Sequence, residues 1–239
     1  MSVLSGAIEL YAQDVLSISS TQLHPFGTMG VTKDGRVFRY SKAGGSTLAP
    51  GKLAVAAAQE AQHENMACAA AAIGATQVTV TLGSVAVTEN QYAGGYLVIN
   101  DATGEGISYL ISGHPAAALS TAVVVTLAQA VTVALTSSSE ASLILSPWSG
   151  AVISVVDQLD MPVGIPNVSV TNGYFGWLQT RGVCATLADE TLAIGEMVTI
   201  GSSVAGAVEE LDGVGEPIVG CAIQAGVDTE YRAVYLQID

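Results

Sequence analysis

The chain has 239 residues, half of them apolar but only 5% aromatic, with 26 glycines and 12% charged residues. This composition of small and β-branched residues predicts an all-β protein with many tight turns, large enough to bury its own core. The formal net charge of −14 argues against nucleic acid as a partner, because an acidic body repels phosphate backbones.

The cysteines and the apolar runs indicate in which cellular compartment the protein is made. Cys68, Cys184 and Cys221 lie in apolar stretches without a Cys-x-x-Cys pair, which predicts buried, reduced thiols in a protein made in a reducing cytoplasm. Residues 1–5 show neither the cationic start nor the apolar core of a signal peptide. The most apolar run, residues 66–75, is about half as long as a membrane span, so we expect no membrane partner.

The N-terminal fifth differs from the rest. Residues 1–23 follow no clean hydrophobic period and predict an extended arm, with room for a short strand, that lies on a neighbouring subunit or stays disordered. Residues 1–52 carry five basic and three acidic side chains, whereas residues 53–239 carry two basic and eighteen acidic ones. The local net charges are therefore +2 and −16. This contrast suggests that the basic segment docks on an acidic protein surface.

A basic hairpin is expected within this segment. Asp34-Gly35 predicts a two-residue turn, because this pair accepts the positive φ values that such a turn requires. After the turn, residues 36–40 alternate, so Arg36, Phe38 and Tyr40 share one face and Val37 and Arg39 share the other. Charge and aromatic bulk on both faces favour a contact with another chain, and a solvated hairpin is the alternative. The candidate interface residues are Lys33, Arg36, Phe38, Arg39, Tyr40 and Lys42.

The rest of the chain predicts short strands separated by turns, as in a β-sandwich or β-barrel. Residues 51–64 favour either one short helix, because they are rich in alanine, or an extended edge. Residues 162–166 predict an irregular connection. Strands are expected at residues 68–73, 77–82, 96–99, 107–111, 122–127, 131–135, 143–145, 152–156, 175–179, 183–187, 197–200, 205–209, 217–225 and 231–238.

Three regions follow from these patterns. They are an arm with the basic hairpin (1–52), a central β domain (53–180) and a small C-terminal β-barrel (181–239). The sequence leaves open whether the barrel packs as one unit with the rest.

The motifs that would indicate catalysis or cofactor binding are incomplete. Gly45 and Gly51 stand one residue too far apart for a phosphate-binding loop. Residues 101–106 begin like a calcium loop, but Ser112 occupies the position of the required acid. His63-Glu64 lacks the second histidine of a zinc protease. We therefore predict no catalytic residue, no cofactor and no metal.

Four stretches of the chain share a sequence pattern with one protein family. They are LHPFGTMGVTKDGRVFRYSKAGGSTLAPGKL (23–53), QYAGGYLVINDATGEG (91–106), GYFGWLQTRGVCATLADETLAIGE (173–196) and residues 204–239. Their pattern resembles that of the decoration, or cement, proteins of tailed-bacteriophage heads. The resemblance implies a structural protein of the outer capsid surface, made in the host bacterial cytoplasm, and not an enzyme. It also implies two partners, the major capsid protein and the chain itself, as a homotrimer.

Two other functions are open at this stage. One is a phage head-fibre or tail component with a receptor- or glycan-binding surface. The other is a carbohydrate-active enzyme on a β scaffold, which would need two acids facing each other across a cleft. Trp148 and Trp177 are candidates for stacking on a sugar, although sparse tryptophans in a β protein also serve as core or interface anchors.

Overall fold

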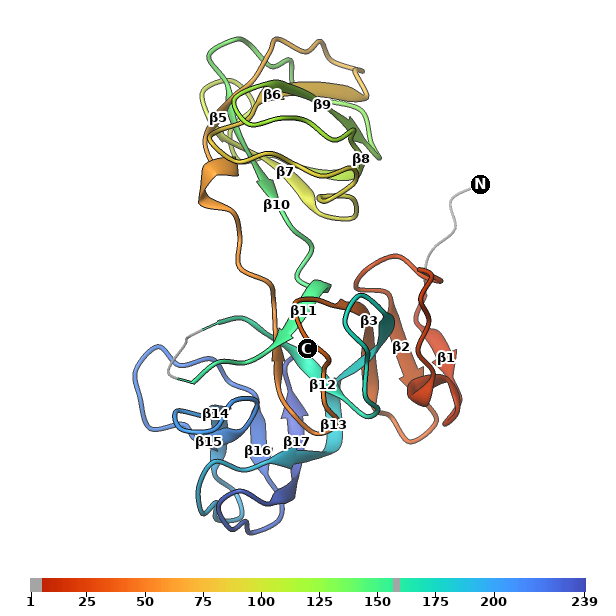
Figure 1. Ribbon diagram of the computed structural model, residues 1–239, viewed down its shortest axis with the longest axis vertical. Coiled ribbons are helices and arrows are strands. Elements are labelled where there is room, and N and C mark those ends of the chain that lie inside the picture. Colours follow the sequence, from red (N-terminus) through yellow and green to blue (C-terminus); the bar gives the residue numbers. More distant parts are fainter. Residues whose placement is uncertain (1–5, 157–159) are drawn as a thin grey trace. The chain divides into compact units, whose positions relative to one another are not determined.

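The computed structural model describes residues 6–156 and 160–239 and confirms the all-β prediction (Figure 1). Within these ranges the only helical segments are two single 3-10 turns, Asp14–Leu16 and Ala61–His63. None of the described helical segments is long and apolar enough to cross a membrane. The first five residues of the expected N-terminal arm lie outside the described residues.

The chain divides into two compact units. Unit 1 comprises Met1–Ala57 together with Pro147–Asp239, and unit 2 comprises Ala58–Ser146. These limits differ from the expected boundaries after residues 52 and 180, because strand β13 runs straight through the second boundary and pairs with β3 from the N-terminal segment. The C-terminal barrel thus packs as one unit with the basic hairpin, which is the arrangement that the sequence left open.

The first half of unit 1 is a closed ring of five strands in the order β3-β11-β4-β12-β13, with β13 returning to β3. We call it the hairpin ring. Its interior holds small and aliphatic side chains such as Leu48, Val163 and Leu178. Strands β1 and β2 extend the sheet beyond β3. The strands are β1 (Ile8–Leu10), β2 (Met29–Thr32), β3 (Val37–Ala43), β4 (Ala54–Val55), β11 (Ser149–Ile153), β12 (Pro162–Pro166) and β13 (Phe175–Leu187).

The second half of unit 1 is the C-terminal ring, which shares β13 with the first. Its order is β13-β17-β16-β14-β15, and a bridge between Ala188 and Val208 closes it. Val198, Val234 and Leu236 fill its interior. This arrangement agrees with the small barrel that the sequence predicts at the C-terminus. The added strands are β14 (Met197–Ile200), β15 (Val208–Glu210), β16 (Gly220–Ala222) and β17 (Tyr231–Gln237).

Unit 2 is a third closed ring. Its sheet order is β5-β10-β7-β8-β9-β6, and a bridge between Cys68 and Val80 joins its ends. The amide of Leu145 donates to Gln59 Oε1 at 2.8 Å, so the two ends of the unit lie side by side. The strands are β5 (Met66–Ala67), β6 (Gln77–Thr81), β7 (Tyr96–Asp101), β8 (Ser108–Gly113), β9 (Ala122–Leu127) and β10 (Glu140–Ile144).

A buried polar network spans the interior of unit 2. The Tyr92 hydroxyl lies 2.6 Å from His63 Nδ1, and the Tyr92 amide donates to His114 Nε2 at 3.0 Å. Burial raises the pKa of Tyr92 to about 12. These contacts explain two of the three histidines as satisfied core residues, not as metal ligands.

Several predicted elements differ in the structure. Of the two structures expected for residues 51–64, the extended one is formed at Ala54 and Val55 (β4), although β4 is not an edge because it pairs with both β11 and β12; a single 3-10 turn follows in place of a helix. Residues 131–135 are not a strand, and only Leu135 makes a bridge, to Ala71. Residues 162–166 are a strand despite their two prolines, since Ile165 and Pro166 pair with β13. The two strands expected at 175–187 are one.

Candidate functional site

The predicted hairpin is present as β2 and β3, but its turn is longer than expected. Gly35 N–H donates to the Thr32 carbonyl at 2.9 Å, and Thr32 N–H donates to the Arg36 carbonyl at 3.0 Å. Gly35 has φ +85°, a left-handed conformation that glycine adopts without strain. The connection is therefore a three-residue loop with a glycine bulge in place of a two-residue turn.

The aromatic residues of the predicted interface belong to the core. Phe38 is 0% exposed and Tyr40 is 2% exposed. Both pack in a cluster with Leu10 and Val15 of the arm and with Phe175 and Trp177 of β13. Tyr40 meets Trp177 edge-on at 5.1 Å between ring centroids, and its hydroxyl accepts a hydrogen bond from the Leu23 amide at 3.0 Å. This corrects the sequence prediction, because these rings are covered by the chain itself.

The N-terminal arm provides that cover. Strand β1 pairs in parallel with β2, and Ser19 bridges to Phe175. The described part of the arm therefore lies on its own unit, where we expected it on a neighbouring subunit or disordered. Leu10 and Val15 are buried because the outer face of β3 and β13 is aromatic and must be shielded from water.

Arg39 is an internal clamp. Its guanidinium forms an ion pair with the Asp239 carboxylate, donates to the Gly27 carbonyl at 3.0 Å and lies 5.6 Å from the Trp148 ring centroid. The hydrogen bond from Arg39 holds the pKa of Asp239 below its usual value, and the same bond raises the pKa of Arg39. Arg39 thus ties the end of the described chain to the hairpin and is not a free surface cation.

The other three cations differ in exposure, because Lys33 is exposed whereas Arg36 and Lys42 are half-buried. Lys33 has a 76% exposed side chain and lies 3.8 Å from Glu9 and 5.6 Å from the Tyr11 ring. Arg36 Nε donates to Asp34 at 2.8 Å, and its guanidinium lies 5.5 Å from the Phe38 ring. Lys42 Nζ lies 5.6 Å from the Phe175 ring. Acids and aromatic rings hold these charges in defined positions while leaving them open to a partner.

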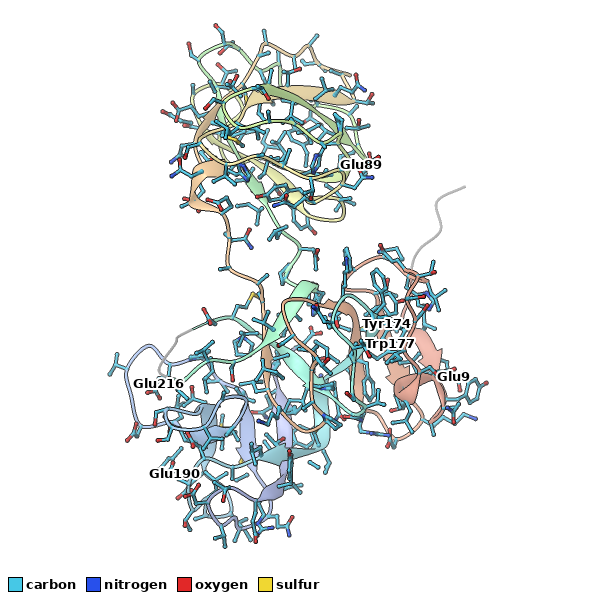
Figure 2. All side chains as sticks on the ribbon, in the orientation of Figure 1. Glu9, Glu89, Tyr174, Trp177, Glu190 and Glu216 are labelled. Atoms are coloured by element: carbon cyan, nitrogen blue, oxygen red, sulfur yellow. The ribbon has the colours of Figure 1, made fainter. Side chains whose placement is uncertain are left out.

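Besides a groove at the hairpin loop that is lined by Lys33, Asp34 and Arg36, two others flank the hairpin. One, of about 260 Å³, runs between the arm and β13 and is lined by Glu9, Asp14, His24 and Trp177 among others. Figure 2 labels two of these residues, Glu9 and Trp177. The Trp177 ring is 4% exposed, so it offers no open face on which a sugar would stack. The second groove, of about 340 Å³, has Arg36 as its one charged lining residue.

The acids, histidines and thiols of the described ranges were candidates for a metal site or a reactive thiol. No group of three or more His, Cys, Asp and Glu side chains there is placed to hold a metal ion. All three cysteines are free thiols. Burial raises the pKa of Cys68 to about 11 and that of Cys184 to about 12, which keeps both as unreactive thiols near neutral pH. Cys221 is partly exposed, in contrast to the burial expected for it.

No family model, no curated protein and no solved structure matches the chain.

The sequence missed several residues that shape the site. Asp239 and Trp148 hold the guanidinium of Arg39 in place. Both lie far from Arg39 along the chain, so no local sequence pattern predicts these contacts. Leu10 and Val15 carried a weak signal, since they are apolar residues in an arm without a clear period. Their position over the aromatic cluster depends on the parallel pairing of β1 with β2, which the arm sequence alone does not predict.

Proposed function

We propose that the chain is a virion structural protein that binds the outer surface of a tailed-phage capsid and stabilises it, with the major capsid protein as its partner. The observation that carries the proposal is a pair of cations on the hairpin loop, the exposed Lys33 and the partly exposed Arg36, in a chain with 21 acidic and seven basic side chains. The sequence resemblance to decoration proteins supports the same assignment, and with it a homotrimeric grouping of copies on the shell.

The physical logic is one of binding linked to stability. A protein that contacts neighbouring capsid subunits only in the expanded shell stabilises that state in proportion to the logarithm of its concentration over the dissociation constant. Cations at the contact steer the encounter and fix its orientation, while apolar neighbours supply the buried area. The hairpin suits this role because the aromatic cluster beneath β3 holds its cations on a stiff support.

The test is co-sedimentation of the purified protein with heads that lack it. We expect Lys33→Glu combined with Arg36→Glu to leave the fold intact and to weaken attachment, as raised salt does for the wild type, because exposed charges are screened within about 10 Å at ~0.1 M salt. Arg39 is left unchanged, since its replacement would disturb Asp239.

Lys52→Glu serves as the control for a charge reversal at another site, because Lys52 lies away from the hairpin loop and donates to the Ala205 carbonyl at 3.2 Å. This variant should attach like the wild type. Attachment of the Lys33 and Arg36 double variant at wild-type strength would remove the hairpin from the capsid contact.

A further inference from the structure

The second of the two grooves that flank the hairpin is neutral except for Arg36, and we call it the Arg36 groove. It is bordered by β13, by the loops at Pro50 and Asn167 and by Leu16 of the arm. Among the described residues no carboxylate lines it, although the chain has 21 acidic side chains. An anion that enters the Arg36 groove therefore meets one positive charge and no like charge on its walls.

Contacts along the whole side chain hold Arg36 in position. A Cβ added at Gly182 would lie 3.0 Å from Arg36 Cγ, so the missing side chain there lets the arginine stem rest on β13. The guanidinium lies 5.5 Å from the Phe38 ring, and its Nε donates to Asp34 at 2.8 Å. Asp34 lines the separate groove at the hairpin loop. No hydrogen bond among the described residues uses Nη1 or Nη2 of Arg36, so these two terminal nitrogens are left for a ligand.

A fixed amide group supplies another donor. Asn167 Nδ2 donates to Gln179 Oε1 at 3.2 Å, while Gln179 Nε2 donates to the carbonyls of Arg181 and Val183. Gln179 is 0% exposed and both hydrogens of its amide nitrogen are engaged, so its oxygen accepts from Asn167. Asn167 Nδ2 keeps its second hydrogen. The polar side chains of the Arg36 groove therefore present donors, which suit a ligand made of acceptors.

We propose that the Arg36 groove binds an aspartate or glutamate side chain carried by a segment of the partner protein. A carboxylate has two acceptor oxygens in one plane, which match the two terminal nitrogens of a guanidinium. Leu16 and Val183, which are 46% and 50% exposed, provide apolar surface for the residues beside that carboxylate. This site rests on the proposed function and adds to it the chemical group that the capsid protein presents to the hairpin.

Charge selects a carboxylate of another protein as the occupant. Nucleic acid would bring many phosphates to a chain of net charge −14, which repels them, whereas a single carboxylate responds mainly to the local charge of Arg36. A second copy of the chain brings the same net charge of −14, so its approach is opposed by long-range repulsion. A partner with one acidic residue in an otherwise neutral segment avoids both costs.

The experiment on heads uses substitutions that separate geometry from charge. Arg36→Lys keeps the positive charge but loses the paired terminal nitrogens, so it should weaken co-sedimentation with heads about tenfold. Asn167→Asp should weaken attachment as well, because it places a carboxylate beside the one that the partner brings. Lys33→Arg is the matched control and should attach like the wild type, since Lys33 does not line the Arg36 groove. Circular dichroism on each variant confirms that the fold is kept.

An experiment without heads tests the chemistry of the groove directly. The purified full chain is titrated with a blocked Ala-Glu-Ala peptide, and the side-chain NMR signals of Arg36 Nε and Asn167 Nδ2 are followed. We expect both signals to shift with this peptide and neither to shift with a blocked Ala-Gln-Ala peptide. In Arg36→Lys the Asn167 signal should stay in place. Equal shifts with the two peptides, no shift with either, or larger shifts with inorganic phosphate would each overturn the proposal.

Failure of this proposal and failure of the proposed function give different results. If Arg36→Lys attaches to heads like the wild type while the Lys33 and Arg36 double charge reversal does not, the carboxylate site is overturned and the proposed function stands. If the wild type does not attach to heads, the proposed function fails, and the peptide titration still decides whether the groove binds a carboxylate. Self-association of the wild type that Arg36→Lys abolishes would overturn the choice of partner.

Discussion

The two units achieve closed β rings in different ways. Unit 2 is one continuous segment in which β7 pairs with β8 and β8 with β9, while β5 with β10, β7 with β10 and β6 with β9 pair over a longer separation within the segment. Unit 1 is assembled from two distant segments, and the strand pairing with the largest separation in sequence joins β3 to β13. All seven basic residues lie in unit 1, whereas unit 2 has six acids and no lysine or arginine. The comparison teaches that unit 2 closes its ring within a single segment, while the ring of unit 1 needs both ends of the chain and carries all the basic residues on which the proposed function depends.

The largest effect is expected from cutting the chain at the unit boundaries. Residues 58–146 alone should fold cooperatively, because their ring closes on itself and its ends lie together. Residues 147–239 alone should not fold, because β13 loses its partner β3. Circular dichroism and amide NMR dispersion of the two fragments measure this difference. A disordered 58–146 fragment would contradict the independence of unit 2.

A smaller effect is expected from the aromatic cluster of unit 1. Phe38→Ala should lower the free energy of unfolding of unit 1 by about 3–5 kcal/mol, because a fully buried ring is lost. Both tryptophans of the chain, Trp148 and Trp177, lie in unit 1, so their fluorescence in denaturant follows this unit alone.

The matched control is Tyr96→Ala, which removes an exposed ring of unit 2 and should leave the tryptophan transition within about 0.5 kcal/mol of the wild type. An unchanged transition for Phe38→Ala would show that Phe38 is not a core residue, and would return it to the surface role first expected.

The smallest effect is a pH dependence of the stability of unit 1 in the acidic range. The folded-state pKa of Asp239 is depressed by Arg39, so this pair stabilises the fold above the unfolded pKa of about 3.9 and loses that contribution as the pH falls through the folded pKa. Because both side chains are partly exposed, we expect only about 1 kcal/mol.

The measurement compares the wild type with Asp239→Asn by tryptophan fluorescence in denaturant. The difference in stability should be present at pH 7 and should shrink below about pH 4. Glu9→Gln, which removes the exposed partner of Lys33, should show no comparable difference. A constant difference between the wild type and Asp239→Asn across the range would assign Asp239 a role other than its charge.

The sequence predicts the class of fold and many strands because alternation is a local signal. Residues 122–127 form β9 as expected, and residues 231–238 contain β17. Alternation also placed Phe38 and Tyr40 on one face of β3 correctly. It could not tell that this face is covered, because the covering side chains, Leu10 and Trp177 among them, come from distant parts of the chain. For residues 131–135 the same signal predicted a strand that is not formed, because the fold offers this alternating run no continuous partner strand.

Strand β13 has a mechanical consequence. Its 13 residues belong to both rings of unit 1, with β3 along one part and β17 along another. A pull along this strand loads its hydrogen bonds in shear, so many must break together before either ring opens. Tension that enters at the hairpin therefore passes into the C-terminal ring through one uninterrupted backbone. Unit 1 should respond to stretching as a single stiff element, with one rupture event in place of two.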